Sequence, residues 1–578
     1  MRKPVSLAAV LLAVNFFICP AIASADLLPQ PGYVGIDFTD FNYETTSYLI
    51  IDEGQSREKS ISPLCNSISD KKCEGKPLRF NGVMPVCSSD SETNCIVTVE
   101  AINSMGERFA AHTTGYFPSG TNTAFRGDQK LHIPNGAASS VWSIPEAAHC
   151  GGTNYGLNFS ADGAYRIGYS KADINNFQIR LSPIQIVTGD KDQIENASGL
   201  SQSCKEVNSG RWACENDGWS NRNAWNTSLT PEWDNFHEIS GTCAVKFRFP
   251  EGFRFRVVVR TNLLPNGWLH GRIGDPRVQI VTNANSTLID VEATPIVVSS
   301  VLASTPWNDL SAVEKSTFDS QGRYTCPNGE HLGERGLLGI DPETRGPLIQ
   351  ASSSGDCSML LLRNWVPRIV DRATQSNTVW SLRNLNNSDQ KATLDLGPNY
   401  EINSCFNDAS SVAGLVTTNS TTYLAGPPVF NKTDGVLTYK VASPHLQPDG
   451  SIFKGTYNLA LRSDVARCIY KFSAAPISAS IEVVSENGTQ QVAITSMSEK
   501  DGWIYLSASG FTYSSPTVKV KLEQAKVEAP AVPASIAVTP VAAPQTPPTK
   551  RSITCINGKN VKKVTAVNPK CPVGYKKK

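Results

Sequence analysis

Four tryptophans lie close together in the sequence, and their type and spacing suit the binding of a carbohydrate. Tryptophan rings stack on sugar rings, and neighbouring side chains such as those of Glu215, Asn216 and Asp217 can bind sugar hydroxyls. The alternative is that the rings pack a loop-rich insertion, where aromatic side chains supply much apolar area. This packing role is the favoured interpretation, and ligand binding is the sharper hypothesis. The candidate ligand-binding residues are Trp212, Trp219, Trp225 and Trp233.

No motif in the sequence identifies a catalytic centre. None of the seven histidines lies in a His-Glu-x-x-His pattern, and no Gly-x-Ser-x-Gly nucleophile motif occurs. A pair of carboxylates for glycoside hydrolysis has no fixed sequence spacing, so that chemistry stays open. No Cys-x-x-Cys occurs, and no histidine lies at a zinc-ligand spacing. We therefore assign no catalytic residue, no cofactor and no metal ligand.

The C-terminal end is strongly basic. Residues 550–578 contain nine basic residues and no acidic ones, whereas residues 26–549 contain 42 basic and 52 acidic residues, a net charge of −10. Such an end can bind anions, or it can simply keep the chain soluble. The candidate polyanion contacts are Lys559, Lys562, Lys563, Lys570, Lys576, Lys577 and Lys578.

An export signal at the N-terminus is consistent with the cysteine content. Residues 1–25 combine two early basic residues, an apolar run from Val5 to Cys19 and the small residues Ala23-Ser24-Ala25 before the expected cleavage. Cleavage removes one of the 15 cysteines and leaves an even number, which suits disulfides in an oxidising compartment. The sequence does not fix the connectivity. Spacing and a weak internal repeat favour the pairs Cys65–Cys73, Cys87–Cys95, Cys150–Cys243, Cys204–Cys214, Cys326–Cys357, Cys405–Cys468 and Cys555–Cys571.

The elements that must position these residues are mostly strands. Segments 177–181, 253–257 and 518–522 alternate apolar and polar residues, which is typical of half-buried strands. Clusters of Gly, Pro and Asn separate such segments. Helical periodicity is scarce, and the best candidate is a helix over residues 306–318 with Thr305 as its N-cap.

The internal repeat predicts two related modules. Val141-Trp142-Ser143 is matched by Val379-Trp380-Ser381, and the segments that begin at Cys243 and Cys468 share a Cys-x-x-Lys-Phe pattern. Later, Gly267-Trp268 is matched by Gly502-Trp503. The expected fold class is mostly β, with two related, disulfide-stapled β-sandwich-like modules. The expected organisation is a signal peptide at 1–25, a cysteine-rich β part at 26–100, modules at 101–300 and 301–525, a proline-rich disordered linker at 526–549, and a basic two-cysteine tail at 550–578.

The C-terminal end also resembles known sequences. Cys555-Ile556-Asn557-Gly558-Lys559 and Pro569-Lys570-Cys571-Pro572 resemble the two-cysteine, lysine-rich endings of uncharacterised secreted proteins from freshwater actinobacteria. The stretch from Gly455 to Trp503 resembles a module that precedes such endings. The resemblance implies a secreted or envelope location, and it implies no activity.

Together these features predict a secreted or cell-envelope-associated, non-catalytic binding protein on the extracellular side, with adhesion or glycan contact as its role. An extracellular hydrolase of polysaccharide or cell-wall polymer and a structural surface-layer component are the alternatives. The expected partners are glycans or anionic envelope polymers, and no nucleic acid. Beyond the signal, no apolar run approaches the roughly 20 residues that span a bilayer.

Overall fold

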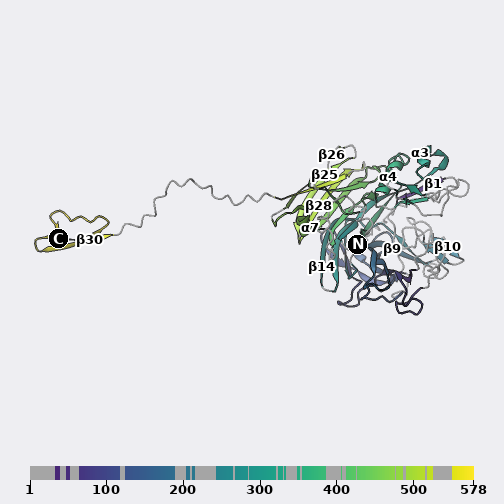
Figure 1. Cartoon of the computed structure of the whole chain (residues 1–578), viewed down its shortest axis with the longest axis horizontal. Coiled ribbons are helices and arrows are strands. Elements are labelled where there is room, and N and C mark those ends of the chain that lie inside the picture. The colour runs from purple at the N-terminus through teal and green to yellow at the C-terminus, as the bar shows by residue number, and fades with distance from the viewer. Residues whose placement is uncertain are drawn as a thin grey trace, which may run out of the picture. The chain divides into compact units, whose positions relative to one another are not determined.

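The computed structural model confirms a mostly β protein (Figure 1). It forms two compact units, residues 1–524 and 525–578. The expected signal peptide and proline-rich linker lie outside the residues that the structure describes. Those residues are 33–38, 47–52, 64–117, 124–188, 204–208, 211–214, 242–263, 267–283, 285–319, 323–327, 329, 331–332, 348–351, 355–385, 405, 412–424, 426–431, 433–474, 477–485, 488, 490–491, 493–513, 517–524 and 550–578.

The largest sheet of the first unit is here called the middle sheet. Its strands pair antiparallel except β14 and β20, which run parallel. In order of pairing they are β2 (Tyr48–Ile51), β3 (Leu78–Val83), β8 (Asn154–Tyr165), β9 (Asp173–Thr188), β19 (Gln375–Asn384), β14 (Gly267–Thr282), β20 (Val412–Thr418), β24 (Lys454–Arg462), β28 (Trp503–Thr512) and β27 (Ile494–Lys500). Three more strands flank β8 and β9, namely β6 (His112–Phe117), β7 (Ser139–Ser143) and β12 (Thr242–Lys246).

A second sheet covers one face of the middle sheet. Its strands in order are β5 (Arg108–Ala110), β4 (Cys95–Ile102), β13 (Arg254–Thr261), β15 (Thr287–Pro306) and the second half of β14. The long strand β14 belongs to both sheets, because residues 267–272 pair with β19 and β20 whereas residues 273–282 pair with β15. In the same way, β15 leaves the second sheet at residue 296, pairs with β19 and then with β1 (Tyr33–Phe38).

A third sheet covers the opposite face of the middle sheet. It comprises β21 (Thr422–Tyr423), β22 (Val429–Asn431), β23 (Val436–Ala442), β29 (Thr517–Gln524), β25 (Ile477–Val484) and β26 (Gln490–Gln491). The helices with eight or more residues in the described chain are α4 (Asp356–Trp365) and α7 (Ser463–Tyr470). Other short elements are η1 (Pro145–Ala147), β16 (Tyr324–Thr325), β17 (His331–Leu332) and β18 (Leu348–Ala351).

Successive side chains of the middle sheet enter different hydrophobic cores. Leu415 of β20 belongs to the core shared with the second sheet, whereas Val416 belongs to the core shared with the third sheet. Ala460 and Leu461 of β24 divide in the same way. Since side chains alternate between the faces of a strand, these strands are buried on both sides. This explains why every residue of β20 is buried.

Five of the seven expected cysteine pairs are disulfides in the structure. Cys150 is also disulfide-bonded, and its pairing with Cys243 stays a prediction. Cys204 and Cys214 are opposite residues in the backbone pairing of β10 (Cys204–Asn208) with β11 (Arg211–Cys214), and a bond between them also stays a prediction. The confirmed pairs are Cys65–Cys73, Cys87–Cys95, Cys326–Cys357, Cys405–Cys468 and Cys555–Cys571.

The two expected modules share one sheet. Strand β19 pairs with β9, β20 pairs with β14, and the expected boundary at residue 300 falls inside β15. Gly267-Trp268 and Gly502-Trp503 both lie where a strand begins. The Cys-x-x-Lys-Phe matches differ, because Cys243 lies in a strand whereas Cys468 lies in α7. Duplication of an ancestral module therefore stays a prediction.

The helix expected over residues 306–318 is much shorter than predicted. Strand β15 continues through Pro306, and a 3-10 turn, η3 (Trp307–Asp309), follows it. Only α3 (Ala312–Lys315) is α-helical. Its N-cap is Ser311, whose hydroxyl accepts from the Glu314 N–H while the Glu314 carboxylate accepts from the Ser311 N–H. This capping box, rather than the proline, begins the helix.

The second unit contains a three-stranded sheet. Its central strand is β30 (Arg551–Asn557), which pairs antiparallel with β31 (Asn560–Ala566) and β32 (Lys576–Lys577). Cys555 of β30 is fully buried and bonded to Cys571. A unit of this size has little apolar core, so the disulfide is a main source of its order.

Candidate functional site

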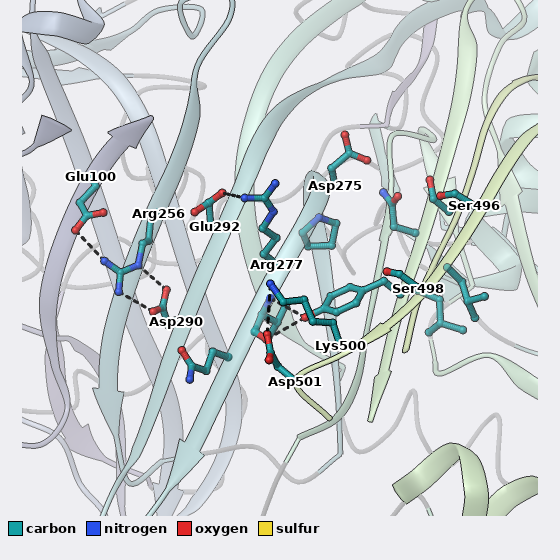
Figure 2. Close-up of a pocket in the computed structure, with 18 of the residues that line it drawn as sticks. Glu100, Arg256, Asp275, Arg277, Asp290, Glu292, Ser496, Ser498, Lys500 and Asp501 are labelled. Atoms are coloured by element: carbon teal, nitrogen blue, oxygen red, sulfur yellow. Dashed lines mark hydrogen bonds and ion pairs between the residues drawn. The ribbon is translucent and has the colours of Figure 1, made fainter. Parts of the chain in front are cut away.

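A polar groove of about 820 Å³ lies where the second sheet ends above the middle sheet. The second sheet covers the middle sheet as far as β14, and β28 and β27 of the middle sheet extend past that edge. One wall of the groove is formed by residues 275–279 of β14, and its floor by residues of β24, β27 and β28 (Figure 2). The groove is thus a step between two stacked sheets.

The floor carries hydroxyl and amide groups. Ser496, Ser498 and Lys500 alternate along β27 and therefore share one face of that strand. Ser507 of β28 is directly opposite Ser496, and Asn458 of β24 is opposite Ser507 on its other side. Where the second sheet covers the middle sheet, this face of the middle sheet carries apolar side chains. In the groove the same face is uncovered, and it carries this row of polar side chains instead.

A tight hairpin forms one end of the floor. Strands β27 and β28 are joined by Asp501 and Gly502, whose φ angles are 53° and 80°. Positive φ at both central residues is the requirement of a type I′ turn, for which Asp-Gly is a preferred sequence. The turn leaves the Lys500 ammonium and the Asp501 carboxylate 3.7 Å apart, with 77% and 71% of their side chains exposed. Both charges are therefore accessible to a ligand.

The wall is shaped by an irregularity in β14. The pairing of β14 with β15 shifts register between Gly274 and Arg277, and Asp275 has a φ of 44°. A bulge of this kind redirects side chains and often lies beside a binding site. Tyr505 joins wall and floor, because its hydroxyl donates to the Val278 carbonyl at 3.1 Å and accepts from the Val278 N–H at 3.3 Å. Burial raises the pKa of this phenol, so it stays protonated.

An ion-pair network lies on the outer face of the second sheet beside the wall. Glu292 accepts from Arg108 at 2.7 Å, from Arg277 at 2.9 Å and from Arg254 at 3.2 Å. Burial opposes ionisation of Glu292, but the hydrogen bond from Arg108 and the neighbouring arginine charges lower the pKa of this carboxyl. Glu292 is therefore a fixed anion that orients three guanidinium groups.

A fourth arginine is fixed in the same face. Arg256 donates to Glu100 at 2.8 Å and to Asp290 at 2.7 Å (Figure 2). The hydrogen bond to Asp290 is the main reason that the pKa of Arg256 is raised. The groove thus offers oriented donors and acceptors of both signs. No histidine or cysteine is among the residues that line it in the described part of the chain.

The residues that line this groove in the described part of the chain are ones that the sequence analysis did not single out. Trp212 lies in β11, and the other three tryptophans, Trp219, Trp225 and Trp233, lie outside the described residues. The seven predicted lysines belong to the second unit, where all of them are exposed. Sequence patterns do not reveal the groove, because its residues come from strands that are more than 200 residues apart in the chain. The one local sequence pattern that marks part of the groove is Asp501-Gly502, which is typical of a tight hairpin turn.

The comparisons with known proteins give no relative. No protein-family model, no curated protein and no solved structure matches this chain. Within the described residues, no helix has both the length and the apolar character needed to cross a membrane.

Proposed function

We propose that this chain is an exported, non-catalytic binding protein of the cell envelope and that its groove binds a carbohydrate. The observation that carries the proposal is the step between the two sheets, where a row of hydroxyl and amide groups meets charges held in fixed positions. Five disulfides in the described residues support an oxidising location.

A carbohydrate suits the mixed polarity of the groove. Each sugar hydroxyl both donates and accepts hydrogen bonds, so it needs donors and acceptors side by side. Arg277 and Lys500 donate, Asp275 and Asp501 accept, and the serine hydroxyls do both. A uniformly charged ligand would meet repulsion from one half of these groups. An open groove also allows a polysaccharide chain to enter along its length.

The network favours binding over hydrolysis. A glycosidase needs one carboxyl group that is protonated near neutral pH and can donate its proton to the leaving oxygen. Glu292, the most deeply buried of the carboxylates that line the groove, has a lowered pKa and accepts from three arginines. Its role is to orient those arginines.

A glycan array with the mature chain, residues 26–578, tests the proposal. The double variant Arg277→Ala/Lys500→Ala removes two exposed donors, and about tenfold weaker binding is expected, equivalent to roughly 1.4 kcal/mol. The matched control is Arg79→Ala/Lys440→Ala, which removes one arginine and one lysine from exposed positions outside the groove. Equal binding by both double variants, or release of reducing ends from the bound polysaccharide, would overturn the proposal.

A further inference from the structure

The C-terminal unit presents positive charge on both faces of a small sheet. Cys555 is the central residue, and the pairing places Lys562 of β31 and Lys577 of β32 opposite it on either side. Opposite residues project from the same face of a sheet, so these two lysines flank Cys555 on one face. Since neighbouring strands are about 4.8 Å apart, their backbones are separated by roughly 10 Å.

The other face of the sheet has the same arrangement around Thr554, the residue before Cys555 in β30. Lys563 is opposite Thr554 on the β31 side. The Lys578 N–H donates to the Thr554 carbonyl at 2.9 Å and continues the pairing on the β32 side. Lys576, opposite Ile556, adds a third charge to this face. Both faces therefore carry lysines on the two sides of the central strand.

The lysine charges are exposed on this unit and are not balanced by acidic residues within 550–578. All seven lysines from Lys559 to Lys578 are exposed, and residues 550–578 contain no acidic residue that could neutralise them. The disulfide between Cys555 and Cys571 holds the loop that carries Lys570 against the central strand. The result is a compact array of cations with fixed backbone positions.

We infer that this unit binds a flexible phosphodiester polymer of the cell envelope that contacts both of its faces. A lysine ammonium is a point charge that donates hydrogen bonds to phosphate oxygens without demanding a particular orientation. A flat lipid surface could use the lysines of only one face. The unit has a single aromatic residue, Tyr575, so it lacks the stacking surface that single-stranded nucleic acid binding uses. A flexible chain of phosphates is the partner that uses both faces.

The test measures binding of the full mature chain to poly(glycerol phosphate) at several salt concentrations. The variants are Lys562→Gln/Lys577→Gln on the first face and Lys563→Gln/Lys576→Gln on the second. The matched control is Lys440→Gln/Lys454→Gln, which removes two exposed charges from the first unit. Each face variant is expected to weaken binding and to reduce the slope of log K against log salt by about 1.4, because each lysine that neutralises a phosphate contributes about 0.7 to that slope. The control is expected to change neither.

Three outcomes would overturn the inference. If only one face variant loses affinity, and phosphatidylglycerol vesicles bind, the unit is a membrane-surface module. If single-stranded DNA of equal charge binds more tightly than poly(glycerol phosphate), the partner is a nucleic acid. If the wild-type chain binds none of these probes, the tail only aids solubility. Measuring the mass before and after reduction verifies that each variant keeps the Cys555–Cys571 bond.

Discussion

Replacing His270 with phenylalanine should remove a large part of the acid sensitivity of the fold. His270 lies in β14, is 1% exposed and stacks on Tyr423 with ring centroids 3.6 Å apart and planes 2° apart. Its Nε2 atom has no hydrogen-bond partner among the described residues. Burial, and then the charges of Arg272 and Arg383, lower the pKa of this imidazole well below 6.5.

The sign of the effect follows from proton binding. The folded chain keeps His270 neutral, whereas the unfolded chain binds a proton as the pH falls through 6.5. Stability that is present above this pH is therefore lost as the solution becomes acidic. One such group lowers the free energy of unfolding by up to about 1.4 kcal/mol for each unit by which the pH falls. Integrated from pH 7 to pH 5, the loss in unfolding free energy is about 2 kcal/mol.

Urea unfolding followed by tryptophan fluorescence at pH 7 and pH 5 measures this loss. In His270→Phe, an aromatic ring still stacks on Tyr423 but cannot titrate, so the drop between the two pH values should shrink by about 2 kcal/mol. Partial burial also lowers the pKa of the His149 imidazole, which leaves a residual drop in both proteins. The control is His112→Gln, at an exposed position of β6. The same drop in wild type and His270→Phe would refute the reasoning.

Two further substitutions test the packing of the sheets. In Gly414→Ala, the new Cβ would lie 2.4 Å from the Trp268 ring, so we expect a loss of about 1–3 kcal/mol in unfolding free energy; an unchanged urea midpoint would show that the middle sheet is less tightly packed. In Glu292→Gln, three arginines lose their shared carboxylate, and we expect about 1–3 kcal/mol of destabilisation together with weaker glycan binding; full stability of this variant would show that the network does not support the groove.

Local alternation is enough to predict individual strands. Phe177, Ile179 and Leu181 are buried in β9, and Val518, Val520 and Leu522 are buried in β29, as the period of two indicates. Alternation predicts a strand with one buried face, so it cannot identify β20, whose residues are buried on both. The predicted start of the helix is wrong. The prediction relied on Pro306 as a favourable first helical residue, but Pro306 is the last residue of β15. Ser311 and Glu314 have the spacing of a capping box and mark the true start.

Long-range pairing cannot be predicted in this way. The partner of Trp380 is Leu181, and the groove combines residues near 277, 458 and 500. Such pairings depend on how sheets stack rather than on local propensity. The basic tail is the easier case, because its charge is a property of composition, and the structure adds the strand register that distributes it over two faces.

The burial of the middle sheet on both faces has a consequence for how the chain folds as it is made. Synthesis begins at the N-terminus, so β14 and β19 exist long before β24 and β28, which complete the sheet. Until residue 524 has been made, β29 of the third sheet is missing, and apolar residues on that face of the middle sheet, such as Val416 and Leu461, remain uncovered. Contacts this distant in sequence form slowly, and incomplete chains with open strand edges aggregate. We therefore expect this protein to depend on a chaperone that holds the nascent chain until its last strands arrive.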